Sequence, residues 1–251
     1  MLDSKRLGEL LGSGVPLLYM ETAASTNDAA KEWARRGAPH GATVAADAQT
    51  GGRGTRGRQF HSPPGGLYMS VVLDAGAALP GHLTTLAAVA AARAAREVTG
   101  LPVGIKWVND LVLEGRKAGG ILTESFEAGG RRMAVVGIGI NTGPWDPPAD
   151  LAGIACTLHR ADRPVDRERI AALAACALLD GLARVPAHMA DYRALCVTLG
   201  REVSFLYDGT PREGTAVAVD DDGALRVRAP GGELRLIAGD VGIRAHGSPP
   251  G

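Results

Sequence analysis

The 251-residue sequence has little of what defines several common classes of protein. Its three cysteines, Cys156, Cys176 and Cys196, lie far apart and form no C-x-x-C pair, which argues against a zinc site or a disulfide framework. Lys and Arg together number 27, as do Asp and Glu, so the formal net charge is zero. A neutral chain has no overall field to hold nucleic acid or an acidic membrane surface, so any anion binding must be local.

Long apolar segments are also missing. The N-terminus has no apolar core typical of a signal peptide, and the longest apolar stretch, around 86–98, is interrupted by Arg93 and Arg96. We therefore expect a cytoplasmic protein that does not enter the membrane. Only about 15 residues precede the first expected strand, too few for a separate domain of about 50 residues, so we expect no DNA-binding domain and no specific DNA binding.

Lysine is scarce as well. Only four of the 27 basic residues are lysines, and the other 23 are arginines. Two of the four, Lys106 and Lys117, fall within the single segment 105–122. Because arginine is the default cation of this chain, that segment either requires an ammonium group or holds two lysines by chance.

The order of hydrophobic patterns predicts an α+β protein, with helices packed on a mixed sheet. Short apolar runs bounded by glycine and polar residues predict strands, and capped or alanine-rich segments predict helices. The expected strands are 16–21, 42–48, 67–73 and four more between 103 and 141. The expected helices are 25–36, 83–99 and a helical region over 166–199.

The pattern changes at Gly200. From there to Arg244, short alternating runs are separated by D-G, D-D-D-G and P-G-G turns, which is typical of a small all-β barrel. We therefore expect two domains, residues 1–199 and 200–251, the second of which ends in a disordered tail.

The segment Q-T-G-G-R-G-T-R-G-R-Q-F, residues 49–60, places three arginines and four glycines between two expected strands. Glycines let backbone N–H groups approach a ligand closely, and guanidinium groups bind phosphate or carboxylate through paired hydrogen bonds. It is no Walker A loop, because no G-K-[ST] follows. The segment is either an anion-binding loop or an exposed basic turn, and the density of glycines favours binding.

Four segments resemble, in their order and spacing, the motifs of the bacterial biotin protein ligases. They are S-T-N-D from Ser25, the loop 49–60, K-W-V-N-D-L-V-L-E-G-R-K-A-G-G-I-L from Lys106, and G-I-G-I-N ending at Asn141. The expected C-terminal barrel resembles the SH3-like domain of the same family, so the resemblance covers nearly the whole chain. It implies the class II synthetase-like catalytic fold of these ligases, in a monofunctional form without a DNA-binding domain.

The resemblance also implies an activity. The protein would join biotin and ATP, with Mg²⁺, to form biotinyl-5′-AMP, and would pass biotin to a lysine of a biotin carboxyl carrier protein. The residue types agree with this chemistry, because a carboxylate must approach an α-phosphate and the catalyst must supply positive charge more than a nucleophile. The sequence shows no Ser-His-Asp or Cys-His arrangement, and it leaves a homodimer open.

By the same resemblance, Lys117 bridges the biotin carboxylate and the α-phosphate, and Arg53 contacts both substrates, so these two are the expected catalytic residues. A compact ammonium group fits between two oxygens where a guanidinium would not. The expected biotin-binding residues are Ser25, Thr26, Asn27, Gln49, Gly52, Arg53, Lys117, Gly119 and Gly120. The expected ATP-binding residues are Arg53, Arg56, Arg58, Phe60, Lys106, Asn109, Asp110 and Asn141, with Asp110 also a candidate Mg²⁺ ligand.

Several of these positions have a purely structural interpretation. Ser25, Thr26 or Asn27 can cap a helix, and a turn between two strands would account for 109–110 and for the strand end at Asn141. Thr55 stands where the family's loop commonly has another arginine, which puts one contact to the adenylate in doubt unless Arg56 supplies it.

Two other functions remain open at this point. A lipoate-attaching ligase uses the same acyl-adenylate chemistry, although the arginine-glycine loop favours biotin. A non-catalytic protein that binds biotin or a nucleotide would not require Lys117.

Overall fold

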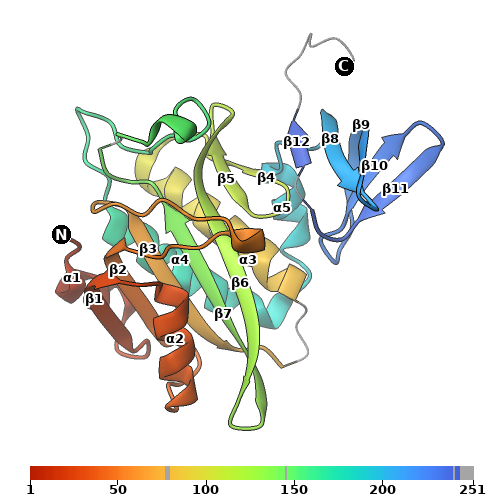
Figure 1. Ribbon diagram of the computed structural model, residues 1–251. Coiled ribbons are helices and arrows are strands. Elements are labelled where there is room, and N and C mark those ends of the chain that lie inside the picture. The colour runs from red at the N-terminus through yellow and green to blue at the C-terminus, as the bar shows by residue number, and fades with distance from the viewer. Residues whose placement is uncertain (77–79, 145, 240, 244–251) are drawn as a thin grey trace.

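The computed structural model describes residues 1–76, 80–144, 146–239 and 241–243. Within them the chain forms a seven-stranded mixed sheet packed with helices, followed by a five-stranded antiparallel sheet (Figure 1). The predicted α+β class, with a second all-β unit near the C-terminus, is confirmed. The predicted disordered tail after Arg244 lies outside the described residues.

The large sheet has the order β1-β2-β3-β7-β6-β5-β4. Strands β1 and β2 run parallel, and every other neighbouring pair is antiparallel. All seven predicted strands are present. Their bounds are Leu17–Ala23 (β1), Thr43–Gln49 (β2), Leu67–Asp74 (β3), Gly104–Lys106 (β4), Asp110–Leu113 (β5), Arg116–Ala128 (β6) and Arg131–Ile140 (β7).

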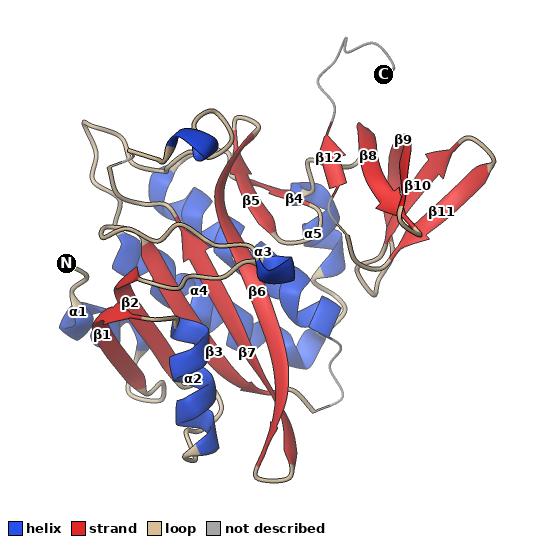
Figure 2. Cartoon of the chain, viewed as in Figure 1, coloured by secondary structure: helices blue, strands red, loops and turns tan. Residues whose placement is uncertain are grey.

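Helices cover both faces of this sheet (Figure 2). Alternate residues of a strand point to opposite faces, so Val71 joins the larger buried cluster while Val72 joins the smaller one beneath α2. Helix α2 contributes Ala30 and Ala34 to that smaller cluster. The helices are α1 (Ser4–Leu11), α2 (Thr26–Arg35), α3 (Pro80–Thr99), α4 (Arg167–Gly181) and α5 (Met189–Leu195).

Helix α1 was not predicted, because its eight residues carry only a short apolar pattern. It is capped by Asp3, which accepts a hydrogen bond from the Arg6 backbone N–H, and it buries Leu7 and Leu11. The Arg6 guanidinium reaches Asp166 next to α4. Helix α1 is therefore held mainly by contacts with a segment about 160 positions away, which no local pattern reveals.

The C-terminal sheet has the order β11-β10-β9-β8-β12. Its apolar residues, including Val203, Phe205 and Leu225, belong to the same buried cluster as Ile105 of the large sheet, so the two units share one hydrophobic core. The strands are Glu202–Tyr207 (β8), Thr210–Val219 (β9), Leu225–Ala229 (β10), Gly232–Leu236 (β11) and Val241–Ile243 (β12).

Two further expectations concern the whole chain. The three cysteines are all unpaired, as their spacing predicts. In the described ranges, helices with the length and apolar character needed to cross a membrane are not found.

Candidate active site

Two adjoining cavities open where the loop 49–60 passes over β6 and β7. The inner cavity is the smaller of the two and lies against the N-terminus of α2. The outer cavity is wider and extends toward the C-terminal sheet. Both are lined by Gly54, Thr55, Phe60, Asn109 and Lys117, so these residues form the junction between the two cavities.

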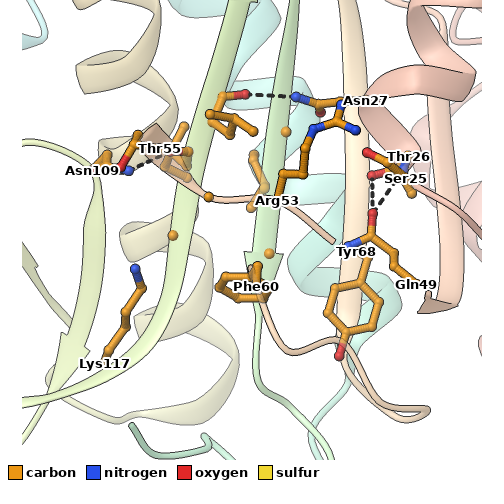
Figure 3. A pocket seen from close by; sticks show the side chains of 17 residues that line it. Ser25, Thr26, Asn27, Gln49, Arg53, Thr55, Phe60, Tyr68, Asn109 and Lys117 are labelled. Atoms are coloured by element: carbon orange, nitrogen blue, oxygen red, sulfur yellow. Dashed lines mark hydrogen bonds between the residues drawn. The ribbon is translucent and has the colours of Figure 1, made fainter. Parts of the chain in front are cut away.

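The inner cavity has a hydrogen-bonded polar wall (Figure 3). The Gln49 side-chain oxygen accepts hydrogen bonds from the Thr26 backbone N–H at 2.9 Å and from its hydroxyl at 3.1 Å. The Gln49 amide nitrogen donates to the Ser62 hydroxyl at 3.0 Å. Ser25 is the N-cap residue of α2, yet its side chain forms no capping hydrogen bond among the described residues. Gln49 therefore does the capping, and Ser25 is left to line the cavity.

Asn27 joins this wall from the first turn of α2. Its amide nitrogen donates to the Leu122 backbone oxygen at 3.2 Å and to the Glu124 carboxylate at 2.7 Å, and its oxygen lies 2.6 Å from the Ser70 hydroxyl. Gly137 of β7 leaves room for this arrangement, because a Cβ there would lie 2.3 Å from the Asn27 side-chain oxygen. The polar groups of the inner cavity are thus positioned before any ligand arrives.

Arg53 lines the inner cavity and belongs to a group of four charged residues. The Arg53 guanidinium makes two hydrogen bonds of 2.6 Å to Asp28, and Lys31 lies 3.0 Å from Asp28 and 2.9 Å from Glu124. The hydrogen bond from Arg53 lowers the pKa of Asp28 to about 2, although partial burial opposes the shift. Burial alone would raise the pKa of Glu124, but hydrogen bonds from Asn27 and Lys31 bring it below its ordinary value. Arg53 is therefore already paired with a carboxylate.

Lys117 stands at the junction of the cavities on the β5–β6 hairpin. Its Nζ lies 2.5 Å from an Asp110 carboxylate oxygen, and its backbone N–H donates to the Ile154 carbonyl at 2.9 Å. A Cβ at Gly120 would lie 3.5 Å from the Lys117 Nζ, an ordinary van der Waals contact, so the position of Lys117 does not depend on this glycine. The ammonium group is thus fixed where contents of the two cavities would meet.

Comparison with known proteins identifies this arrangement. The biotin/lipoate A/B protein ligase family model matches residues 19–141, and the biotin protein ligase C terminal domain model matches residues 198–244. A biotin--[acetyl-CoA-carboxylase] ligase of Mycobacterium tuberculosis is 30% identical over 96% of this chain and 95% of its own. The chain belongs to the biotin protein ligase family. The resemblance seen in the sequence motifs is thereby confirmed.

Two further relatives of this family show how far the similarity extends. The bifunctional ligase/repressor BirA of Bacillus subtilis is 42% identical over 59% of this chain, which spans about half of that relative, 47% of its length. The biotin protein ligase of Aquifex aeolicus, solved in complex with biotin and ATP, superposes with a TM-score of 0.78 at 25% identity. That match covers 91% of this chain and 98% of the Aquifex chain, so the fold is that of a biotin ligase.

Most of the residues singled out in the sequence line these cavities. Ser25, Thr26, Asn27, Gln49, Arg53, Lys117 and Gly120 line the inner cavity, and Arg56, Arg58, Asp110 and Asn141 line the outer one. Phe60, Asn109 and Lys117 line both. Asn141 also donates a hydrogen bond to the Cys156 carbonyl at 2.8 Å, so its strand-end role exists as well.

Three predicted residues lie elsewhere. A Cβ at Gly52 would sit 2.5 Å from the Phe60 carbonyl, and one at Gly119 would sit 2.5 Å from the Gly139 carbonyl, so both glycines allow close backbone packing. Lys106 lines a groove beside the C-terminal sheet that adjoins the outer cavity and shares Arg56, Arg58, Asp110 and Lys117 with it. Direct substrate contact has no support from the geometry for the two glycines, and for Lys106 it stays a prediction.

Sequence reasoning missed several residues of this site. Asp28 follows the quoted S-T-N directly, and Gly137 and Gly139 belong to the quoted G-I-G-I-N, so a signal was present for all three. Trp107 lines the outer cavity from within the K-W-V-N-D segment. Lys31, Ser70 and Glu124 carried no signal, because their roles arise from pairings across the fold.

Proposed function

We propose that this biotin ligase family member forms biotinyl-5′-AMP from biotin and ATP and transfers biotin to a lysine of a biotin carboxyl carrier protein in the cytoplasm. One observation carries the proposal: the Lys117 ammonium stands between an inner cavity with a wall of neutral hydrogen-bonding groups and an outer cavity rich in cations. The Aquifex relative, which binds biotin and ATP, supports the same assignment.

Biotin fits the inner cavity by its chemistry. A cyclic urea offers N–H donors and a carbonyl acceptor, and the hydroxyls and amides of Ser25, Thr26 and Gln49 offer complementary groups without net charge. The acid chain of biotin would then run toward Arg53 and Lys117. Its carboxylate would take the place of Asp28 on Arg53, because an exposed ion pair is weak and easily exchanged.

ATP would occupy the outer cavity with its phosphates beside Arg56, Arg58 and Lys117. A biotin carboxylate oxygen attacks the α-phosphorus, an oxygen–phosphorus bond forms, and the bond to the β-phosphate oxygen breaks to release pyrophosphate. Lys117 reduces the repulsion between the two anions and stabilises the charge that develops on the phosphate oxygens. Asp110 holds the ammonium in place before substrates bind.

The residues of this site suit Mg²⁺ only when ATP is bound as well. Asp110 is the one acidic residue that lines the outer cavity among the described residues, and these contain no group of three His, Cys, Asp or Glu side chains suited to a metal. Mg²⁺ commonly binds one or two carboxylates together with substrate phosphates, so Asp110 would supply the protein ligand. When bound, the ion would neutralise phosphate charge.

Transfer of biotin to the carrier lysine would take place at the same junction of the two cavities. The amine of the carrier lysine attacks the acyl carbon of the adenylate, the bond to the phosphate oxygen breaks, and AMP leaves with the electron pair while the amine loses a proton. The Arg53 to Arg58 part of the loop would cover the mixed anhydride and limit its hydrolysis.

The test is a reconstitution with the pure protein, ATP, Mg²⁺, biotin and a biotin carboxyl carrier domain. We expect pyrophosphate release that depends on biotin, and a carrier whose mass increases by one biotinyl group. Lipoate in place of biotin is the matched control and should support little release. Equal rates with lipoate, or no release with biotin, would contradict the proposal.

A further inference from the structure

The turn between β9 and β10, residues 220–223, docks the C-terminal sheet onto the catalytic unit (Figure 1). Arg193 of α5 donates a hydrogen bond to the Val219 carbonyl at 2.7 Å and pairs with the Asp221 carboxylate. His82, in the first turn of α3, donates to the Asp221 carbonyl at 3.0 Å. Two helices of the catalytic unit therefore hold this turn, partly through its backbone carbonyls.

A third hydrogen bond links the same turn to the active site. The indole N–H of Trp107 donates to the Gly223 carbonyl at 2.8 Å, in surroundings where the Trp107 side chain is almost fully buried. Gly223 has a φ of 89°, a conformation that other residues rarely adopt, and a Cβ there would lie 3.3 Å from the Thr85 methyl group. The carbonyl can face Trp107 because a glycine makes this tight turn.

The Trp107 ring also lines the outer cavity, and it begins the short turn that carries Asn109 and Asp110 into the site. The backbone of this turn is fixed at each step. The Trp107 N–H donates to the Thr198 hydroxyl at 2.9 Å, and the Val108 carbonyl accepts from the Tyr192 hydroxyl at 3.0 Å. The one link from this turn to the C-terminal sheet among these hydrogen bonds is the Trp107 indole.

We propose that Trp107 is a positioning residue through which the C-terminal sheet sets the nucleotide side of the active site. The inference rests on the proposed function, in which ATP occupies the outer cavity. Loss of the indole donor leaves the Gly223 carbonyl without its buried partner and frees the ring to shift in the cavity wall. Of the residues in this turn, only Asn109 lines the inner cavity, and its side chain is held there by its own hydrogen bond to the Ile121 carbonyl at 2.7 Å, so biotin binding alone depends little on the Trp107 link.

The direct test is Trp107→Phe, which keeps an aromatic ring and deletes the indole N–H. We expect the KM for ATP to rise about tenfold, while the Kd for biotin, measured by calorimetry without ATP, changes less than about twofold. Trp33→Phe is the matched control, because Trp33 packs against the smaller cluster beneath α2, and it should leave both constants unchanged. An unchanged KM for ATP in Trp107→Phe would overturn the inference, as would equal weakening of biotin and ATP.

A second variant removes the contacts that α5 makes with the same turn. Arg193→Met removes the hydrogen bond to Val219 and the pairing with Asp221, and Arg193 touches neither cavity. We expect a smaller rise in the KM for ATP, of a few fold, and an effect less than additive with Trp107→Phe because both changes act on one element. Strict additivity would show that the turn does not transmit the effect.

Binding of a non-hydrolysable ATP analogue to the biotin-saturated protein separates this inference from the proposed function, because it needs no turnover. A wild type that binds analogue and biotin but releases no pyrophosphate would contradict the proposed function alone. A Trp107→Phe variant that binds the analogue as tightly as wild type does would contradict the inference alone.

Discussion

The inner and outer cavities differ in how their polar groups are held. In the inner cavity, Thr26, Asn27 and Ser70 are buried and joined by hydrogen bonds between neutral groups. In the outer cavity, Lys117 is about one-third exposed and is held by a single carboxylate, Asp110. Buried polar groups are costly to leave without partners, whereas a partly exposed ion pair contributes little. The neutral wall of the inner cavity is thus preformed, whereas Lys117 is held by a contact that an anionic ligand can replace.

The largest expected effect tests the outer cavity. Lys117→Ala removes the ammonium at the junction, so we expect the rate of adenylate formation to fall about 100- to 1000-fold with little change in thermal stability. Lys117→Arg should rescue poorly, because a planar guanidinium does not fill the position of a compact ammonium. Pyrophosphate release is the measurement, and Lys5→Ala on the exposed face of α1 is the control. A Lys117→Ala protein with normal rates would remove the main catalytic assignment.

The next effect tests whether the inner cavity is as rigid as its hydrogen bonds suggest. In Gly137→Ala the new Cβ would lie 2.3 Å from the Asn27 side-chain oxygen, so Asn27 must shift and lose its hydrogen bonds. Overpacking of this kind costs about 1–3 kcal/mol, and we expect biotin affinity, measured by calorimetry, to fall about tenfold or more. Gly14→Ala is the matched control, because a Cβ at Gly14 meets nothing within 4 Å. Unchanged affinity would show that the inner wall can adapt.

Thr55 lines both cavities, so it tests how the junction retains the intermediate. Its hydroxyl replaces a guanidinium that could make two charge-assisted hydrogen bonds to the adenylate phosphate. We expect Thr55→Arg to slow the release of preformed biotinyl-5′-AMP up to about tenfold and to reduce labelling of an unrelated protein such as albumin. Faster release in Arg56→Ala alone would mean that Arg56 has taken this role. No change in either variant would show that this half of the loop does not hold the intermediate.

The smallest expected effect concerns the ion pair between Asp28 and Arg53. The hydrogen bond from Arg53 lowers the pKa of Asp28 to about 2, so its stabilising contribution is fully present above about pH 4 and is lost as the pH falls through about 2. The Asp28 side chain is 47% exposed, which limits the contribution to less than about 1 kcal/mol. Thermal unfolding of wild type and Asp28→Asn should therefore converge between pH 4 and pH 2. A difference that stays constant over this range would contradict the pairing.

Much of the fold could be predicted from the sequence, because alternating and capped patterns depend on neighbours only a few positions apart. The seven strands of the large sheet and the change to an all-β unit at Gly200 follow from such patterns. Helix α1 could not be predicted, since its main partners near Asp166 are far away in sequence. The helical region 166–199 divides into α4 and α5, and α3 begins at Pro80, slightly earlier than expected.

The candidate site, too, could be predicted only in part from the sequence. The motif order predicted that the loop 49–60 and Lys117 would lie together, and they do meet at the junction of the cavities. The ion pairs of Arg53 with Asp28 and of Lys117 with Asp110 were not foreseen. The resemblance indicated which residues serve the family's chemistry, but it did not indicate what holds each of them before the substrates bind.

The sequence by itself determined the element types, the glycine-rich loop and the scarcity of lysine, because composition and local periodicity are properties of neighbouring residues. Only the tertiary structure decided which carboxylate holds each cation, that Gln49 rather than Ser25 caps α2, and that the turn 220–223 meets Trp107. Among these pairs, Asp110 and Lys117 are 7 positions apart, and Trp107 and Gly223 are 116 positions apart. Their partners are selected by packing and by the need to satisfy buried polar groups, which act only once the chain has folded.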